Sequence, residues 1–391
     1  MAIKIASQSS LADPVSGARQ KRLFLNEASL AGKLQHPHIV RVYDAGTSHE
    51  MLYIVMEYIA GSTLKRYCHP DALLPLDQVV EIIFKCSNAL DYACRQGLIH
   101  RDIKPANLLI TSGTDVKISD FGSALLVDSE LTQVLDSVGT PSYMAPEQIA
   151  GREITHQADI YALGVVMYEL LTGRLPFQAE NQFELLNKVS HNQPLPIEQL
   201  RPDIPLPVRQ IVYRCMAKQP AERYADWGEL SKALAQVHAQ LESHSDSESD
   251  TRRFNRMKQL HFFRNFSDVE LWEVLRISEW RDFSGDRTLL QEGRVGGSLF
   301  ILASGEVRVI KGETNLGKVT AGHCFGEMAY IQGSRRARSA SVVSSGPVSI
   351  IKLKSESLTQ ASERLQSKFN QALLQTLAAR LEQTSLLASA L

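Results

Sequence analysis

Three short motifs in a fixed order constrain the fold of this chain more than any other feature. The first is HRDIKPAN at residues 100–107. The second, DFG, begins at Asp120, thirteen residues after Asn107, and the third, APE, occupies residues 145–147. A single DFG tripeptide arises by chance, but three motifs in this order and at these spacings do not. Together they supply a lysine and the carboxylate and amide oxygens that Mg²⁺ prefers as ligands.

The motifs resemble those of bacterial-type (Hanks-type) serine/threonine protein kinases. By this resemblance Asp102 accepts the proton of the substrate hydroxyl, and Lys104 lies near the phosphoryl group transferred from ATP. Asn107 and Asp120 would hold Mg²⁺. A lysine two residues after Asp102, and Thr140 ahead of the APE motif, are typical of serine/threonine kinases rather than tyrosine kinases.

The N-terminal residues MAIK resemble the end of the kinase strand whose lysine contacts the α- and β-phosphates of ATP, which assigns that contact to Lys4. The glycine-rich loop that precedes this strand in the family is missing from the sequence. We therefore expect an N-terminally truncated kinase domain with an incomplete small lobe. The alternative is a protein whose small lobe lacks two strands. For Lys4 itself, the alternative is a solvated terminal lysine.

Leucines at helical spacing predict an amphipathic helix over residues 18–34. Within it, Glu27 stands ahead of the run HPHIV, where kinases carry the glutamate that pairs with the ATP-binding lysine. The resemblance therefore pairs Glu27 with Lys4, and the alternative is a surface glutamate.

Two β-type runs follow, at residues 39–43 and 52–58, separated by a polar turn. The second run ends in Met56, Glu57 and Tyr58. By resemblance these residues are the gatekeeper and the hinge, where the adenine of ATP hydrogen-bonds the backbone.

Apolar residues at helical spacing predict a helix over residues 76–96, ended by Gly97, that supports the catalytic loop. Two further residues match structural positions of kinases. Asp159 is expected to cap the backbone of the catalytic loop. Arg223 is expected to pair with Glu147, the glutamate of the APE motif.

The segment between the DFG and APE motifs corresponds to the kinase activation loop. Arg101 precedes the catalytic aspartate, as in kinases that are switched by phosphorylation of this loop, because a guanidinium pairs well with phosphate. Candidates for the modification are Ser129, Thr132 and Ser137, of which the last two are best placed. The alternative for each is an unmodified loop hydroxyl. Thr140 is expected to anchor the catalytic aspartate.

A polar, acidic, serine-rich run at residues 242–251 has no hydrophobic side chain with which to form a core, and it predicts a linker. We expect a kinase domain at residues 1–240, a linker at 241–252 and a second domain at 253–391. The second domain opens with a capping box, Ser267 to Glu270, which starts a helix. Short apolar runs divided by glycines then predict a small β-barrel or jelly roll.

The run GHCFGEMA at residues 322–329 resembles the phosphate-binding cassette of cyclic nucleotide-binding domains. In that family a short helix meets the cyclic phosphate, a glutamate binds the ribose 2′-hydroxyl and an arginine pairs with the phosphate. Gly326 and Glu327 match directly. The arginine is ambiguous, because counting from Phe325 leads to Arg336, whereas alignment of the next strand leads to Arg338.

We prefer Arg338, because a slip of one residue would turn the inward face of that strand outward. The proline that usually precedes this arginine is absent in either alignment. Ser339, beside Arg338, occurs with either nucleotide and gives no preference between cAMP and cGMP. The alternative is a degenerate domain that binds no nucleotide and serves as a protein-interaction module.

A long helix is predicted over residues 357–385 from an i, i+4 stripe of apolar residues. The stripe consists of Leu365, Phe369, Leu373, Leu377 and Leu381. In the family this helix covers the nucleotide pocket, and pairing with a partner is the other possibility. No helix-turn-helix pattern follows it, so we expect no nucleic-acid partner.

Composition is that of an ordinary globular protein, with 44% hydrophobic and 22% charged residues in 391. Residues 1–251 carry 22 basic and 30 acidic side chains, a net charge of −8, whereas residues 252–391 carry 20 and 13, a net charge of +7. The basic second part favours an anionic partner or, equally, a solvated basic surface. Five cysteines without metal-binding spacing indicate reduced thiols. No signal peptide or long apolar run is apparent, so we expect a cytoplasmic protein with no membrane contact.

The sequence thus predicts an α+β multidomain chain. Its parts are a bilobal protein-kinase fold with an incomplete small lobe and a C-terminal β-jelly-roll cyclic nucleotide-binding domain with flanking helices. The predicted function is transfer of the ATP γ-phosphoryl group to serine or threonine hydroxyls of protein substrates, with Mg²⁺, under regulation by cAMP or cGMP. The alternative is a pseudokinase scaffold, or a nucleotide-sensing interaction protein, without catalysis.

Overall fold

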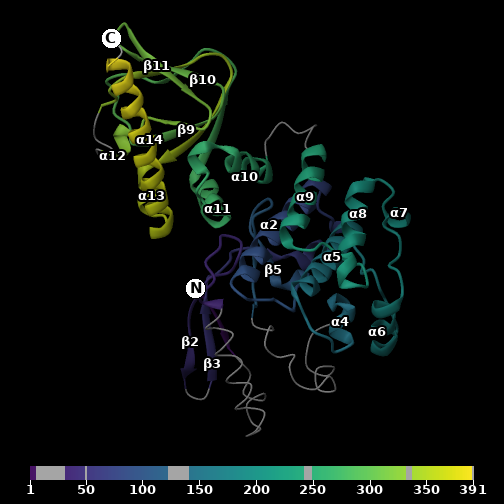
Figure 1. Cartoon of the computed structure of the whole chain (residues 1–391). Coiled ribbons are helices and arrows are strands. Elements are labelled where there is room, and N and C mark those ends of the chain that lie inside the picture. The colour runs from purple at the N-terminus through teal and green to yellow at the C-terminus, as the bar shows by residue number, and fades with distance from the viewer. Residues whose placement is uncertain (6–30, 49–50, 122–140, 242–248, 332–336, 390–391) are drawn as a thin grey trace. The chain divides into compact units, whose positions relative to one another are not determined.

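A computed structural model describes residues 1–5, 31–48, 51–121, 141–241, 249–331 and 337–389. The chain divides into two compact units, Met1–Thr251 and Arg252–Leu391 (Figure 1). The predicted helix over 18–34 lies outside the described residues except for its last four. The first seven residues of the run expected to be a linker, 242–248, also lie outside them.

The first unit begins with a small antiparallel sheet of order β1-β3-β2. Its strands are β1 (Ala2–Ile5), β2 (Val42–Ser48) and β3 (Met51–Met56). Pairing places Lys4 of β1 opposite Ile54 of the central strand. This sheet therefore holds Lys4 at a fixed register despite its position near the chain's first residue.

The predicted strand over 39–43 is wrong in its bounds. The strand β2 begins at Val42 and continues to Ser48, through residues that were expected to form a polar turn. Backbone pairing with β3 holds these residues extended, for example Ala45 opposite Ile54. Ile39 instead forms an isolated parallel bridge with Ile118 of the larger lobe.

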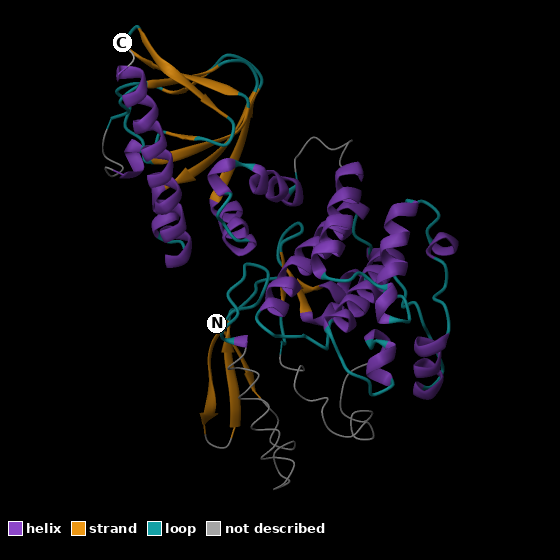
Figure 2. Ribbon diagram, in the orientation of Figure 1, coloured by secondary structure: helices purple, strands orange, loops and turns teal. Residues whose placement is uncertain are grey.

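The larger lobe of this unit is mainly helical (Figure 2). Its α-helices are α2 (Leu76–Arg95), α4 (Pro146–Ile149), α5 (His156–Thr172), α6 (Gln182–His191), α7 (Ile197–Leu200), α8 (Leu206–Cys215) and α9 (Trp227–Leu241). Single 3₁₀ turns are η2 (Leu64–Tyr67), η3 (Pro70–Ala72), η4 (Pro105–Asn107), η6 (Pro141–Tyr143) and η7 (Pro220–Glu222). A sheet of order β4-β5-β6 is formed by β4 (Ser62–Thr63), β5 (Leu108–Ile110) and β6 (Val116–Ile118).

The centre of this lobe is α5, in which every residue from Ala158 to Thr172 is buried. A largely apolar helix that is buried on every side is stable only inside a core, and α2 and α8 pack against it. It ends at Gly173, where φ is +70° and a Cβ atom would lie 2.4 Å from the nitrogen of Pro70. The predicted helix over 76–96 is confirmed as α2, with Gly97 at φ +78° just beyond its end.

The second unit contains two four-stranded antiparallel sheets, of order β11-β10-β13-β8 and β12-β9-β14-β7. The strands are β7 (Ser278–Phe283), β8 (Thr288–Leu290), β9 (Ser298–Ser304), β10 (Glu306–Lys311), β11 (Thr314–Thr320), β12 (Cys324–Phe325), β13 (Ser341–Ser344) and β14 (Val348–Lys354). The helices are α10 (Asp250–Gln259), the 3₁₀ turn η9 (His261–Phe263), α11 (Asp268–Ile277), α12 (Met328–Ile331), α13 (Ser355–Thr359) and α14 (Glu363–Ser389). The predicted combination of a bilobal kinase-type fold with a jelly roll is thereby confirmed.

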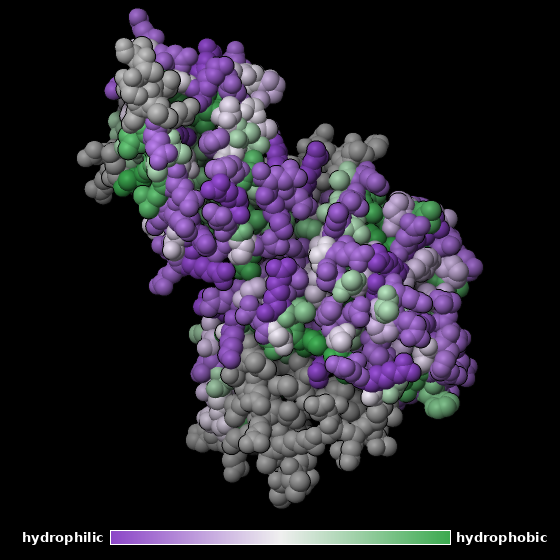
Figure 3. All heavy atoms as spheres, viewed as in Figure 1, coloured by the Kyte–Doolittle hydropathy of each residue, from purple (hydrophilic) through white to green (hydrophobic). Residues whose placement is uncertain are grey.

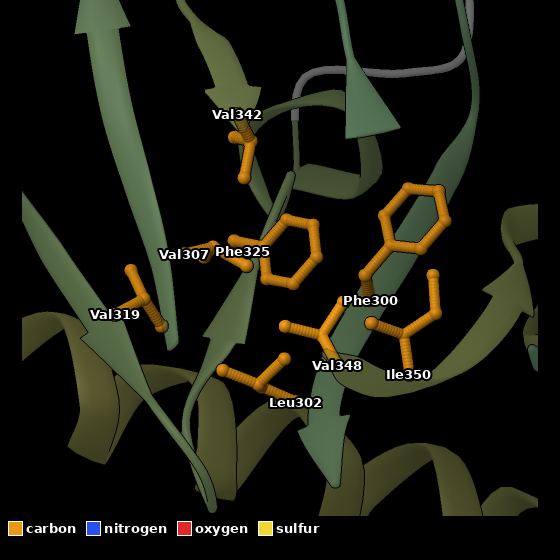
Figure 4. Packing of buried hydrophobic residues seen from close by; sticks show 8 residues of the cluster. All are labelled: Phe300, Leu302, Val307, Val319, Phe325, Val342, Val348 and Ile350. Atoms are coloured by element: carbon orange, nitrogen blue, oxygen red, sulfur yellow. The ribbon is translucent and has the colours of Figure 1, made fainter. Parts of the chain in front are cut away.

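Side chains from both sheets of the second unit form one apolar core (Figure 4). At its centre the rings of Phe300 and Phe325 stack, with centroids 5.3 Å apart and planes 10° apart. The capping box is confirmed at the start of α11, where Ser267 accepts a hydrogen bond from Glu270 N and the Glu270 carboxylate accepts one from Ser267 N. The helix α10 starts at Asp250, inside the segment expected to be a linker.

The terminal helix is broken where one continuous helix over 357–385 was expected. The short helix α13 ends at Thr359, and α14 starts afresh at Glu363. Ser362 accounts for the restart, because its hydroxyl accepts a hydrogen bond from Leu365 N, as N-cap side chains do, and donates one to Glu273.

None of the helices in the described part of the chain is both long enough and apolar enough to cross a bilayer. On the face shown in Figure 3, hydrophilic residues cover most of the described surface, and hydrophobic residues form small separate groups.

Candidate functional site

Asp159 of α5 holds the backbone at the start of the catalytic-loop motif. Its carboxylate accepts hydrogen bonds from the backbone N–H groups of His100 and Arg101, both at 2.7 Å. Arg101 needs this support, because its φ of +63° lies in the left-handed region, which costs a residue with a side chain about 1–3 kcal/mol. Burial raises the pKa of Asp159, and His100 and the two backbone donors oppose that shift. The expectation that Asp159 caps this backbone is confirmed.

Three predicted site residues meet at the next turn of the chain. The amide nitrogen of Asn107 donates to Oδ2 of Asp102 at 3.0 Å and to the Asp102 carbonyl at 2.8 Å. The ammonium of Lys104 lies 2.7 Å from the same Oδ2. Both contacts fix the Asp102 carboxylate in one orientation, and its side chain keeps 21% of its exposure.

The DFG aspartate is tied to both lobes. Oδ1 of Asp120 lies 2.5 Å from the ammonium of Lys4, and the Ser119 hydroxyl donates to Oδ2 at 3.4 Å. Ser119 also donates from its backbone N–H to the carbonyl of Asn107 at 2.9 Å, which joins this segment to the catalytic loop. Asp120 has a φ of +60°, so the second strained residue of the described chain also lies at this site.

The oxygen atoms of Asn107 and Asp120 fit a hard cation. Because the Asn107 amide nitrogen faces Asp102, its oxygen faces away from that carboxylate. Within the described residues there is no cluster of three or more His, Cys, Asp or Glu that could hold a metal by itself. A Mg²⁺ ion here would take most of its ligands from phosphate and water, as is usual for this ion.

The predicted hinge follows β3 directly. Met56 is the last residue of that strand, and Glu57 donates from its backbone N–H to the Arg41 carbonyl at 2.8 Å. The Glu57 carboxylate accepts a hydrogen bond from Lys117 at 2.9 Å, while Tyr58 is 66% exposed. Glu27, the predicted partner of Lys4, lies outside the described residues.

The activation-loop candidates Ser129, Thr132 and Ser137 also lie outside the described residues, as does Thr140, the expected anchor of the catalytic aspartate. The chain is described again from Pro141. The expected pair between Arg223 and Glu147 is confirmed, with two hydrogen bonds of 2.6 and 2.7 Å.

A second candidate site is a cavity of about 290 Å³ in the jelly roll. This volume is close to the lower end of the range of about 300–1,000 Å³ for ligand pockets. Residues that line it include Phe325, Gly326, Glu327, Arg338, Ser339 and Arg380. Two guanidinium groups and one carboxylate give this lining a net positive charge, which suits an anionic ligand.

Arg338 is fixed in the cavity wall by the backbone. Its guanidinium donates to the carbonyls of Gly326 and Ser298 at 2.9 and 2.8 Å. Burial lowers the pKa of Arg338, and the nearby Glu327 carboxylate opposes the shift. Gly326 suits this position, because its φ of +75° favours glycine and an added Cβ atom, 3.0 Å from Nη1 of Arg338, would push that guanidinium aside. Arg336, the alternative arginine, lies outside the described residues.

Sequence reasoning missed Arg380 of α14. Its guanidinium donates to Oε1 of Glu327 at 2.7 Å and to the carbonyl of Cys324. The spacing in the sequence does indicate its place, because Arg380 lies seven residues, about two helical turns, after the buried Leu373 and so on the same face of the helix. A charged residue on the buried face of a helix indicates a partner inside the domain.

Comparison with known families assigns a family to a segment of each unit. Residues 1–238 match the family model of the protein kinase domain, and the chain belongs to that family. Residues 280–364 match the cyclic nucleotide-binding domain, so the chain combines a kinase domain with a domain of that second family.

Relatives of the first unit are bacterial serine/threonine kinases. The chain is 37% identical over 236 residues to "Probable serine/threonine-protein kinase PknB" of Lactococcus lactis, covering 60% of this chain and 37% of the relative. It is 35% identical over 245 residues to "Serine/threonine-protein kinase PknB" of Mycobacterium leprae, covering 61% and 39%. It is 38% identical over 257 residues to "Serine/threonine-protein kinase PknH" of Mycobacterium bovis, covering 65% and 42%. The chain thus spans about two fifths of the length of these relatives.

Proposed function

We propose that this protein is a serine/threonine protein kinase whose C-terminal domain binds a cyclic nucleotide that regulates it. The first part of the proposal is supported by kinase-family membership and by the names of the relatives. The second part is supported by the match of residues 280–364 and by the positively charged cavity.

The observation that carries the catalytic proposal is the convergence of Asn107 and Lys104 on Oδ2 of Asp102. A carboxylate held in one orientation is suited to accept the proton of a serine or threonine hydroxyl during phosphoryl transfer. Lys104 balances the charge of Asp102 and stands where its ammonium is available to the transferred phosphoryl group. Tyrosine kinases lack a lysine at this position, so a protein serine or threonine is the proposed acceptor.

Asn107 and Asp120 would hold Mg²⁺, which supplies positive charge to the phosphates of ATP when it is bound. Lys4 is the proposed ligand of the α- and β-phosphates. It already contacts Asp120 at 2.5 Å, so one ammonium would face both the DFG carboxylate and the phosphates. Met56, Glu57 and Tyr58 are the proposed contacts for adenine, through their backbone groups.

The catalytic proposal is tested with the full chain, labelled ATP and a generic protein substrate, comparing the wild type with Asp102→Asn. Loss of a positioned general base lowers the rate about 100-fold or more. The matched control is Asp71→Asn, the same substitution at an exposed aspartate of η3. It is expected to retain the wild-type rate. Equal rates for wild type and Asp102→Asn would overturn the assigned chemistry, and an inactive wild type would favour a scaffold without catalysis.

Calorimetry with cAMP and cGMP tests the second part. Arg338 is the proposed partner of the cyclic phosphate, and Glu327 that of the ribose 2′-hydroxyl, with Gly326 and Ser339 beside them. Arg338→Gln should lose binding, whereas Arg264→Gln, at an exposed arginine of the same unit, should not. No heat with either nucleotide, or an unchanged affinity of Arg338→Gln, would contradict the assignment.

Regulation requires that the nucleotide bind two states of the protein with different affinity. The proposal therefore predicts that the nucleotide changes the kinase rate of the wild type and leaves that of Arg338→Gln unchanged. Equal responses of the two proteins would separate nucleotide binding from control of the kinase.

A further inference from the structure

We propose that Arg380 is a positioning residue that couples the ribose of the bound nucleotide to the second half of α14. The proposal rests on the cyclic nucleotide binding proposed above. It adds a residue outside the cassette and a route from the ligand to the terminal helix.

Arg380 reaches from α14 into the cavity wall with both ends of its guanidinium. Nη1 donates to Oε1 of Glu327, and Nη2 donates to the carbonyl of Cys324. The side chains of Arg380 and Glu327 retain 33% and 12% of their exposure, so the ion pair is largely shielded from water. One residue of the helix therefore holds the cassette at two points, three residues apart.

The second half of α14 has little apolar contact of its own. Leu365, Phe369 and Leu373 are buried at 0 to 3% exposure. From Leu374 to Glu382, where the description of side chains in this helix ends, no residue is buried, and Leu374 and Leu381 are 68% and 70% exposed. Only Thr376, Leu377 and Arg380 of this stretch are half-buried, so the two hydrogen bonds of Arg380 are a main contribution to its docking, and one of them is directed at Glu327.

The geometry leaves Glu327 able to serve both partners. An ionised carboxylate accepts several hydrogen bonds, and Arg380 uses Oε1, so Oε2 is available to a ribose hydroxyl. A carboxylate whose orientation is already fixed binds that hydroxyl with a smaller loss of entropy. Coupling of this kind is reciprocal, because a ribose that binds better when Arg380 is docked must also favour the docked helix.

The experiment measures the affinity of the full chain for cAMP, cGMP and 2′-deoxy-cAMP, in the wild type and in Arg380→Gln. We expect the preference of the wild type for cAMP over the 2′-deoxy analogue to shrink about tenfold in the variant, as for loss of one charge-assisted hydrogen bond. Arg380→Lys keeps the charge but not the two-point contact, and it should restore only part of the preference. Lys368→Gln, which removes a positive charge from α14 outside the cavity lining, is the control and should retain the preference.

Hydrogen exchange gives a second readout. In the wild type, cAMP should slow exchange of the α14 amides after Leu373, and in Arg380→Gln it should not. If the variant binds cAMP but keeps the wild-type preference for ribose, the coupling is wrong and the nucleotide site stands. If the variant loses cAMP and 2′-deoxy-cAMP affinity equally, Arg380 serves the phosphate or the fold, which also overturns the proposal. If the wild type binds no nucleotide, the proposed function fails first.

Discussion

Arg223 encloses Glu147 with every hydrogen-bond donor of its guanidinium in use. Two N–H groups donate to the Glu147 carboxylate at 2.6 and 2.7 Å, and the other three donate to the carbonyls of Ala217, Gln157 and Lys218. The two side chains are only 1% and 5% exposed. This pair fixes the APE motif to the segment that follows α8, and so it sets the end of the activation loop.

Breaking this pair should strongly destabilise the first unit. In Glu147→Gln the buried guanidinium of Arg223 loses its counter-charge. In Arg223→Met the buried carboxylate of Glu147 loses its counter-charge. We expect each to lower the free energy of unfolding by about 3–5 kcal/mol. Unfolding of the full chain in urea measures the loss, with hydrogen exchange of the α5 amides as the signal that reports on the first unit. Arg95→Ala, which breaks an exposed pair with Asp91, should cost at most about 0.5 kcal/mol. Equal losses in buried and exposed variants would contradict the argument.

Removal of the Asp159 carboxylate should affect both stability and rate. Asp159→Ala leaves the backbone N–H groups of His100 and Arg101 buried without an acceptor, at about 1–3 kcal/mol each. Arg101 is then no longer held at its left-handed φ, so the catalytic loop should relax and the phosphoryl-transfer rate should fall. Asp159→Asn keeps one acceptor oxygen, so its stability and its phosphoryl-transfer rate should lie between those of the wild type and of Asp159→Ala. An alanine variant as active as the wild type would refute this role.

Nucleotide binding should be sensitive to one methyl group at Gly326. In Gly326→Ala the new Cβ lies 3.0 Å from Nη1 of Arg338, at a φ of +75°. We expect a loss of affinity for cAMP of about tenfold, because Arg338 must move. Gly312→Ala is the control, since Gly312 has a φ of +57° but no heavy atom within 4 Å of the added Cβ. It also places an alanine at a left-handed φ, without displacing the arginine. Calorimetry on both variants separates the two effects.

Lys218 should make the stability of the first unit depend on pH. It donates to the Val189 carbonyl at 2.6 Å and lies 4.2 Å from the centre of the Phe177 ring. Burial, aided by Arg223, lowers the pKa of Lys218 from 10.5 to about 8. The unfolded state therefore binds more protons between these pH values. The contribution of Lys218 to the free energy of unfolding is therefore fully present above pH 10.5, and it is lost as the pH falls from 10.5 through about 8.

The check for this prediction is Lys218→Arg, because arginine stays protonated over the whole range. The free energy of unfolding of the wild type, minus that of the variant, should rise between pH 8 and pH 10.5. Taking the difference removes the contribution of the tyrosines, which titrate in both proteins. A flat difference would mean that Lys218 is hydrated in the folded state.

Sequence reasoning reached the catalytic loop because its functional residues are close in the chain. Asp102 and Asn107 are five residues apart, so one loop brings them together. The contact between Lys4 and Asp120 spans 116 residues and depends on how the small sheet meets the larger lobe. The motifs named both residues, but the direct contact between them was not predicted. The course of β2 was missed for a related reason, since its polar residues are extended by pairing with β3.

In the second unit, the glycine and glutamate of the cassette were visible as a motif. The choice of Arg338 over Arg336 remains a prediction, and the contacts of Arg338 with the carbonyls of Gly326 and Ser298 are compatible with it. The pattern of apolar residues does not predict the break before α14, because the break depends on Ser362 and its tertiary contact with Glu273. Arg380 was not predicted, because an apolar stripe identifies the buried face of a helix only by its hydrophobic residues and gives no signal for a charge on that face.

The burial of α5 on every side has a consequence during synthesis of the protein. The ribosome releases residues 156–172 before it makes α8, which packs against them, and α9, which closes over α2 and α8. Until residue 215 emerges, the nascent chain carries a largely apolar helix without α8, one of the helices that cover it, and until residue 241 emerges α2 and α8 still lack α9. Chaperones should therefore bind this segment during translation, and expression fragments that stop short of α9 should be recovered in inclusion bodies.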